Sequence, residues 1–332
     1  MKIDFHNHFY PPGYLEKLEQ WGRHRYEFFP DGKGLKVVKQ KGARFLAITP
    51  QHVSVEQRLA DMDRLGIDMQ VLTLTTPSVY FSTRKRNLYL AKMSNDFFAD
   101  LCQKHPRRFV AFASVPLSHP DDAVEELRRA VEDLKVKGVV LGSNIDGKHL
   151  HSKEFWPFYE EVDRMRLPIF IHPMVPVHPE SFAEFVLVPL VGFCMDTTVT
   201  VAKMVFSGLF EKYPKLTLIL PHLGGTLPFL FERIDAGYKS YAECQPHIPR
   251  PPSSYLKKFY YDTVSFYTPA LMCTYLAVGA DQMVMGSDYP HVIGDITRSV
   301  SSIQELSIPQ EEKEKILGKN AEKILRLDSP NP

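Results

Sequence analysis

Short apolar runs recur along the chain, and segments with helical spacing of apolar and polar residues separate them. Runs that are apolar at nearly every position are typical of parallel strands buried on both faces. The segment from Asp121 to Leu134 shows the helical pattern, with Leu and Val toward one face and Glu, Arg and Asp outside. The runs predict eight strands, at residues 2–6, 69–74, 109–115, 136–141, 167–172, 216–220, 259–263 and 282–286.

Eight strands that alternate with helices predict a (β/α)8 TIM barrel. An open doubly wound sheet is the alternative, but the strand number fits closure and the sequence contains no Gly-x-Gly-x-x-Gly motif. Residues 10–53 form an insertion after the first strand, which we expect to act as a lid or substrate wall. Residues 309–325 predict an extra C-terminal helix. We therefore expect one barrel domain over residues 1–332.

Composition and charge narrow the classes of function. The chain has 332 residues, of which 40 are basic and 39 acidic, for a formal net charge of +1. This balance gives no electrostatic basis for binding nucleic acid or an anionic membrane. The four cysteines form no Cys-x-x-Cys pair, so we expect reduced thiols in a cytoplasmic protein. The first strand begins at once and apolar stretches such as 185–193 are short, so we expect neither a signal peptide nor a membrane span.

Four of the predicted strands end on residues that bind metals or carry protons. His6 and His8 stand two apart on the first strand, so their side chains share a face. His172 ends the fifth strand, His222 ends the sixth, and Asp288 follows the eighth. The C-terminal ends of barrel strands meet at one mouth, where active sites lie. These residues predict a catalytic divalent metal site, which suits Zn²⁺ and would also accept Mn²⁺, Fe²⁺ or Co²⁺.

The other histidines lack this placement at strand ends. His291 is intermediate, because it follows Asp288 in a loop that should face the pocket. We expect the remainder to be surface or loop residues: His24, His52, His105, His119, His149, His151, His178 and His247.

Four motifs surround the candidate ligands: His6-Asn7-His8, Ile171-His172-Pro173, His222-Leu223-Gly224-Gly225 and Gly286-Ser287-Asp288-Tyr289-Pro290. Together they resemble the amidohydrolase superfamily. More narrowly, the chain is similar to its decarboxylating branch, typified by 2-amino-3-carboxymuconate 6-semialdehyde decarboxylase. The resemblance extends from the first strand to the last helix.

The resemblance implies different roles for these residues. His6, His8, His172 and Asp288 match the residues that hold the metal in that branch, and His222 matches the acid/base beside the metal-bound water. We expect His222 and Asp288 to take part in catalysis. The fourth strand ends on residues 140–143 without a lysine, which favours one metal over a carbamylated two-metal site.

The resemblance also implies contacts to a carboxylate substrate. Arg233 matches an arginine that reaches the site of the neighbouring subunit, which implies a homodimer or a higher homo-oligomer. Arg44 in the insertion is a second candidate, because a guanidinium pairs both oxygens of a carboxylate. The aminocarboxymuconate enzyme has an aromatic residue where this chain has His291. This departure argues against that particular substrate and makes His291 a candidate substrate contact.

These observations predict a metal-dependent, nonoxidative decarboxylase of a small unsaturated or aromatic carboxylic acid, which is a carbon–carbon lyase. The alternative is a metal-dependent hydrolase or hydratase of a small cyclic ester, lactone or dicarboxylate, because the same pocket could direct hydroxide at carbon. A third hypothesis is a non-catalytic binding protein on an inherited barrel, but the complete ligand set argues against it.

Overall fold

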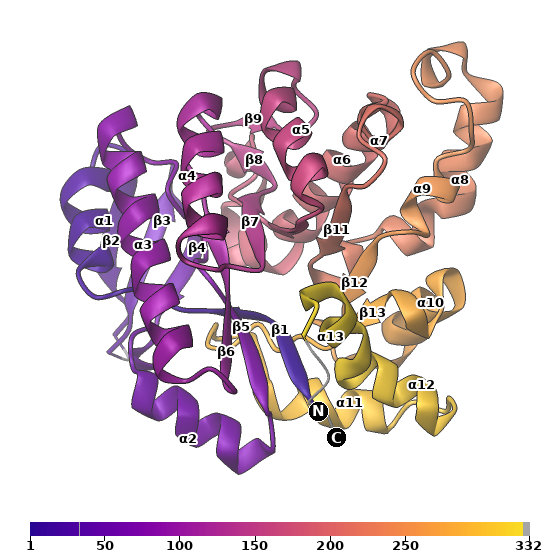
Figure 1. Cartoon of the computed structure of the whole chain (residues 1–332). Coiled ribbons are helices and arrows are strands. Elements are labelled where there is room, and N and C mark those ends of the chain that lie inside the picture. Colours follow the sequence, from indigo (N-terminus) through magenta and orange to yellow (C-terminus); the bar gives the residue numbers. More distant parts are fainter. Residues whose placement is uncertain (33, 328–332) are drawn as a thin grey trace.

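The computed structural model describes residues 1–32 and 34–327; residue 33 of the predicted insertion and residues 328–332 of the predicted domain lie outside it. Eight parallel strands form one sheet (Figure 1), and neighbours in this sheet follow one another along the chain. They correspond to the eight predicted strands: β1 (Ile3–His8), β5 (Met69–Thr73), β6 (Phe109–Ser114), β7 (Gly138–Gly142), β10 (Pro168–His172), β11 (Thr217–Leu220), β12 (Tyr260–Asp262) and β13 (Met283–Val284).

Hydrogen bonds between the first strand and the end of the last one close the barrel. The amide of Phe5 donates to the carbonyl of Met285 at 2.8 Å, and the amide of His8 donates to the carbonyl of Tyr289 at 2.7 Å. The predicted TIM barrel is therefore confirmed, and the open sheet is excluded as the alternative. Closure also places the loop that carries Asp288 beside the two histidines of β1.

An irregularity in β1 turns its histidines toward the mouth of the barrel. The pairing of β1 with β5 shifts in register between Asp4 and Asn7. Phe5 and His6 lie within this irregular stretch, and Phe5 packs among apolar side chains in the barrel interior. His6 and His8 come together with their Nε2 atoms 3.0 Å apart. A β-bulge re-aims side chains in this way, so the neighbours Phe5 and His6 both face the barrel axis.

Helices cover the outside of the strands (Figure 1). α2 begins after Ser54, whose hydroxyl accepts a hydrogen bond from the amide of Gln57 at 3.2 Å, and it ends at Gly66 in the left-handed conformation. The helices are α2 (Val55–Leu65), α3 (Arg84–Lys104), α4 (Pro120–Glu132), α5 (Trp156–Met165), α6 (Phe193–Phe206), α7 (Leu209–Lys212), α8 (Leu227–Ser240), α9 (Ser253–Leu256), α10 (Thr268–Val278) and α11 (Ile296–Gln304).

The C-terminal segment packs against the barrel interior, as an added helix should. α12 (Gln310–Glu314) continues through a π-helical turn into α13 (Asn320–Leu325). Ala321, Ile324 and Leu325 belong to the same apolar cluster as the interior side chains of the strands. The predicted extra helix is therefore present.

The insertion after β1 contains its own small sheet. α1 (Tyr14–Gly22) precedes an antiparallel sheet of β2 (Tyr26–Pro30), β3 (Lys36–Gln40) and β4 (Ala43–Ile48). A short hairpin of β8 (Asn144–Ile145) and β9 (Lys148–His149) follows β7. β4 contributes a wall of the cavity described below, whereas movement of the insertion as a lid remains a prediction.

One helical run is longer and more apolar than expected. Residues Glu184–Phe206 span 23 residues with a mean hydropathy of 1.8 in their most apolar window, which by length and composition is enough to cross a membrane. The expectation that all apolar stretches are too short is therefore wrong. Within the protein, 44% of that window is buried. A helix that packs in the core of a soluble protein can have the same length and hydropathy.

A buried arginine fastens α2 beneath the first strand. Arg58 is 1% exposed, and its guanidinium donates to Asn7 Oδ1 at 2.9 Å, to Gln70 Oε1 at 2.7 Å and to the carbonyl of His8. Burial lowers the pKa of Arg58 to about 10, which still leaves it charged at neutral pH. Arg58 thus joins α2 to β1 and β5 at the part of β1 that carries the two histidines.

We predict that Arg58→Ala lowers the free energy of unfolding by about 3 kcal/mol or more. Three buried acceptors lose their donor, and each unpaired buried group costs about 1–3 kcal/mol. Arg64→Ala on the same helix is the matched control, because Arg64 is 61% exposed in its ion pair with Asp61. Urea unfolding monitored by circular dichroism measures both, and equal losses would contradict the proposed role of Arg58.

Candidate metal centre and active site

Four side chains meet at the C-terminal mouth of the barrel. His6 and His8 come from β1, His172 is the last residue of β10, and Asp288 follows β13. One ligand atom from each lies within 4.8 Å of the others, and all four residues are buried. Asp288 Oδ1 is 3.1 Å from His6 Nε2 and 3.3 Å from His8 Nε2. The fold therefore brings the four predicted ligands together in an arrangement that could hold a metal ion.

The unmet polar groups of this cluster fit a bound cation. Asp288 Oδ1 is buried without a hydrogen-bond partner, although two imidazole nitrogens lie near it. Burial opposes a charge on His6, but the Asp262 and Asp288 carboxylates outweigh it and raise the pKa of His6 to about 10. A proton on His6 offsets the negative charge of these two carboxylates, and a bound metal ion would offset that charge instead. Three nitrogens and one carboxylate oxygen suit Zn²⁺, Mn²⁺, Fe²⁺ or Co²⁺.

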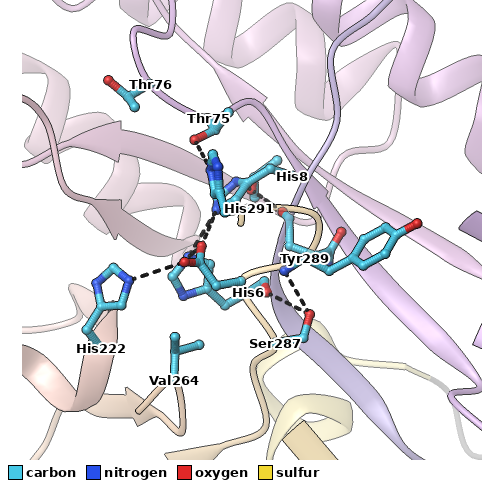
Figure 2. A network of polar contacts seen from close by, with 12 residues as sticks. His6, His8, Thr75, Thr76, His222, Val264, Ser287, Tyr289 and His291 are labelled. Atoms are coloured by element: carbon cyan, nitrogen blue, oxygen red, sulfur yellow. Dashed lines mark hydrogen bonds and ion pairs between the residues drawn. The ribbon is translucent and has the colours of Figure 1, made fainter. Parts of the chain in front are cut away.

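The turn that carries Asp288 is held by a buried network below it. Asp288 itself has a φ of 56°, in the left-handed region that residues with a side chain adopt less often than glycine does. The preceding Ser287 donates from its hydroxyl to Asp4 Oδ2 at 2.7 Å and from its amide to Asp4 Oδ1 at 3.0 Å. Figure 2 shows Ser287 also accepting from the amide of Tyr289. These bonds compensate the strain at Asp288 and aim its carboxylate at the histidines.

His222 stands beside the cluster rather than within it. Its Nε2 is 3.7 Å from Asp288 Oδ2, and its side chain is 15% exposed (Figure 2). It begins a short turn after β11 in which both His222 and Leu223 have positive φ, at 51° and 57°. The imidazole thus lies next to the ligands and borders the cavity, which is where an acid/base must lie to reach a substrate.

A cavity of about 350 Å³ opens over the cluster. Its polar lining consists of His172, His222, Asp288, His291 and Arg44. The other lining residues are apolar: Phe45, Leu46, Ala47, Phe185, Val186, Pro189, Leu190, Phe193, Val292 and Ile293. An apolar cavity with a few convergent polar groups is the usual form of a small-molecule site.

His291 and Arg44, the two predicted substrate contacts of this chain's own site, both border the cavity, and their contact with a substrate stays a prediction. His291 lies 2.9 Å from Thr75 Oγ1 through its Nε2, and its ring centroid is 5.0 Å from that of His8 (Figure 2). Burial lowers the pKa of His291, so the ring is neutral at neutral pH. Arg44 lies on β4, where its backbone pairs with Lys39 of β3. Among the described residues, its side chain has no hydrogen bond or ion pair, and it lines the cavity. Its guanidinium is therefore available to an anionic ligand.

Arg233 is not part of this constellation within one chain. It is exposed on α8 and is absent from the residues that line the cavity among those described. Its predicted contact with substrate therefore requires the site of another subunit.

Sequence reasoning missed two residues behind the site. His52 was expected at the surface or in a loop; it does lie in a short turn but is fully buried, with its ring centroid 5.0 Å from that of His291. Asp262 ends β12 and is also fully buried. The available signal was the carboxylate itself, which is unusual at the end of a buried strand.

Comparison with known proteins agrees with this geometry. Residues 3–327 match the amidohydrolase family. The 2-amino-3-carboxymuconate-6-semialdehyde decarboxylase of Dictyostelium discoideum is 30% identical over 100% of this chain and 93% of its own length. The gamma-resorcylate decarboxylase of a Rhizobium species is 32% identical over 82% of this chain and 87% of its own length.

A solved structure extends the likeness to three dimensions. The dihydroxybenzoic acid decarboxylase of a Polaromonas species, with bound manganese and the inhibitor 2-nitroresorcinol, has a TM-score of 0.83 and 27% identity. The match covers 99% of this chain and 97% of that one. The chain therefore belongs to the amidohydrolase superfamily, in the branch of its decarboxylases.

Proposed function

We propose that this protein is a metal-dependent, nonoxidative decarboxylase of a small aromatic or unsaturated carboxylic acid. The position of His222 carries the proposal. It lies 3.7 Å from Asp288, outside the group of four ligand atoms, and it borders the cavity. A decarboxylase needs a proton donor in that place, because carbon must gain a proton where CO2 leaves.

Each residue of the site then has a role in the reaction. His6, His8, His172 and Asp288 would hold the ion, which supplies Lewis acidity toward a substrate oxygen. Arg44 pairs with the carboxylate and orients it. His222 delivers the proton to the carbon that loses CO2, and the apolar walls exclude water from that carbon.

The residues that line the cavity support an unsaturated ring as substrate. Ten of its fifteen lining residues are apolar, which favours a flat hydrocarbon body over a polar one. His291 offers a neutral polar edge that suits a hydroxyl or carbonyl substituent. The gamma-resorcylate decarboxylase is named for an aromatic ring acid, which agrees with this substrate class, whereas aminocarboxymuconate semialdehyde is an open-chain unsaturated acid.

An exposed face on α8 supports a dimer in which Arg233 serves the partner. Phe229 is 79% exposed and stands one helical turn before Arg233, so both residues share a face. A large apolar side chain in that position favours coverage by another surface. The dimer, the cytoplasmic location and Zn²⁺ as the native ion remain predictions, and the manganese in the Polaromonas enzyme supports Mn²⁺ as well.

We predict that the metal-loaded protein releases one CO2 per molecule of a hydroxybenzoic acid such as 2,6-dihydroxybenzoate. In D2O, the product should carry one deuterium at the carbon that lost CO2. Gas analysis and proton NMR measure the two quantities. Cleavage of a lactone or ester without release of CO2 would instead support the hydrolase alternative.

His222→Ala should keep one metal ion per chain and lose about 10²–10⁴-fold in turnover, because an acid/base but no ligand is removed. Metal analysis by mass spectrometry and steady-state kinetics measure the two effects. His172→Ala is the matched variant and should lose the metal itself. A parallel loss of metal in His222→Ala would make His222 a ligand and overturn its assigned role.

Arg233→Ala should raise the KM for the acid about tenfold or more, because one partner of the carboxylate is removed. Mixed with an inactive His6→Ala protein, it should form hybrid dimers that recover part of the activity. One site of each hybrid would then combine intact ligands with an intact Arg233. No recovery in hybrids verified by native mass spectrometry would argue against a shared site.

A further inference from the structure

Asp262 connects a metal ligand to the acid/base through the two oxygens of one carboxylate. Its Oδ2 is hydrogen-bonded to Nδ1 of His6. Its Oδ1 accepts from the amide of Leu223 at 3.3 Å and from the amide of Val264 at 3.0 Å. We propose that Asp262 is a positioning residue that sets the tautomer of His6 and holds the turn that presents His222.

The contact with His6 decides which ring nitrogen is available to a metal. A carboxylate has no proton to donate, so the hydrogen of a neutral imidazole must lie on Nδ1. The lone pair is then on Nε2, which is the atom that faces His8 and Asp288 at 3.0 and 3.1 Å. A second hydrogen-bond partner commonly fixes the tautomer of a ligating histidine in this way.

The other oxygen stabilises the turn after β11. His222 and Leu223 both adopt positive φ, which costs free energy for residues with a side chain. The amide of Leu223 points into the protein and finds its acceptor in Asp262. The amide of Val264, two residues after Asp262, donates to the same oxygen and so helps to hold the carboxylate in place. Removing the carboxylate would release His222 from its place beside Asp288.

A purely structural carboxylate and a tautomer-setting one respond differently to asparagine. In Asp262→Asn, the amide oxygen can still accept from Leu223 and Val264, so the fold and the turn are retained. Its NH2 group, however, donates to Nδ1 of His6 and forces the hydrogen onto Nε2, where it blocks the metal. In Asp262→Ala, nothing dictates the tautomer, and His6 can still present Nε2.

The decisive experiment measures the affinity of both variants for Mn²⁺ and Zn²⁺ by competition with a chromophoric chelator. We expect affinity to fall roughly 100-fold in Asp262→Asn and roughly tenfold in Asp262→Ala. The metal-free Asp262→Asn protein should unfold within a few degrees of the parent, which shows that it folds. Asp281→Asn is the matched control and should change neither quantity, because Asp281 is 71% exposed.

Equal or stronger binding by Asp262→Asn compared with Asp262→Ala would overturn the tautomer role. The second half of the proposal rests on the proposed function and is tested at saturating metal. There, Asp262→Ala should lower kcat with little change in KM, and Asp262→Asn should keep more of the kcat. An unchanged kcat in Asp262→Ala would overturn the role in placing His222. The metal affinities require no turnover, so they stay decisive even if no acid is decarboxylated.

Discussion

The site depends on the closure of the barrel between its first and last strands. Only this closure brings His6 and His8, near the N-terminus, close to Asp288. Backbone hydrogen bonds, such as the one from the amide of His8 to the carbonyl of Tyr289, form the closure. Gly286 permits the approach, because a Cβ there would lie 2.8 Å from Cβ of His6. The position of Asp288 therefore follows from backbone contact rather than from side-chain attraction alone.

Buried polar residues around the closure form hydrogen bonds with the strand and the turn that carry the site. Arg58 donates hydrogen bonds to the side chain of Asn7 and to the carbonyl of His8, and Asp4 accepts two hydrogen bonds from Ser287. The carboxylate of Asp262 is hydrogen-bonded to Nδ1 of His6. Buried polar groups are stable only when their partners are supplied. These fully buried polar residues thus surround the four side chains that could hold a metal ion.

Different parts of the cavity carry the polar side chains and the walls that would contact a substrate. His172, His222 and Asp288 form its polar side, while its walls come from β4 of the insertion, from the segment before α6 and from the loop after Asp288. These wall segments are connections between core elements, which vary more easily than strands do. A barrel with a constant polar side and variable walls can serve different acids with one reaction, which agrees with the variety of decarboxylases among its relatives.

The apolar runs and their spacing determined eight strands, and the residues that end these strands identified His6, His8, His172, His222 and Asp288 as a set. These features are local in sequence, because strand periodicity and strand-end position are both visible there. Only the tertiary structure decided that the shift within β1 aims both histidines inward, that His52 is buried behind His291, and that Asp262 joins His6 to the His222 turn. These depend on contacts between residues far apart in the chain, whose partners no local pattern specifies.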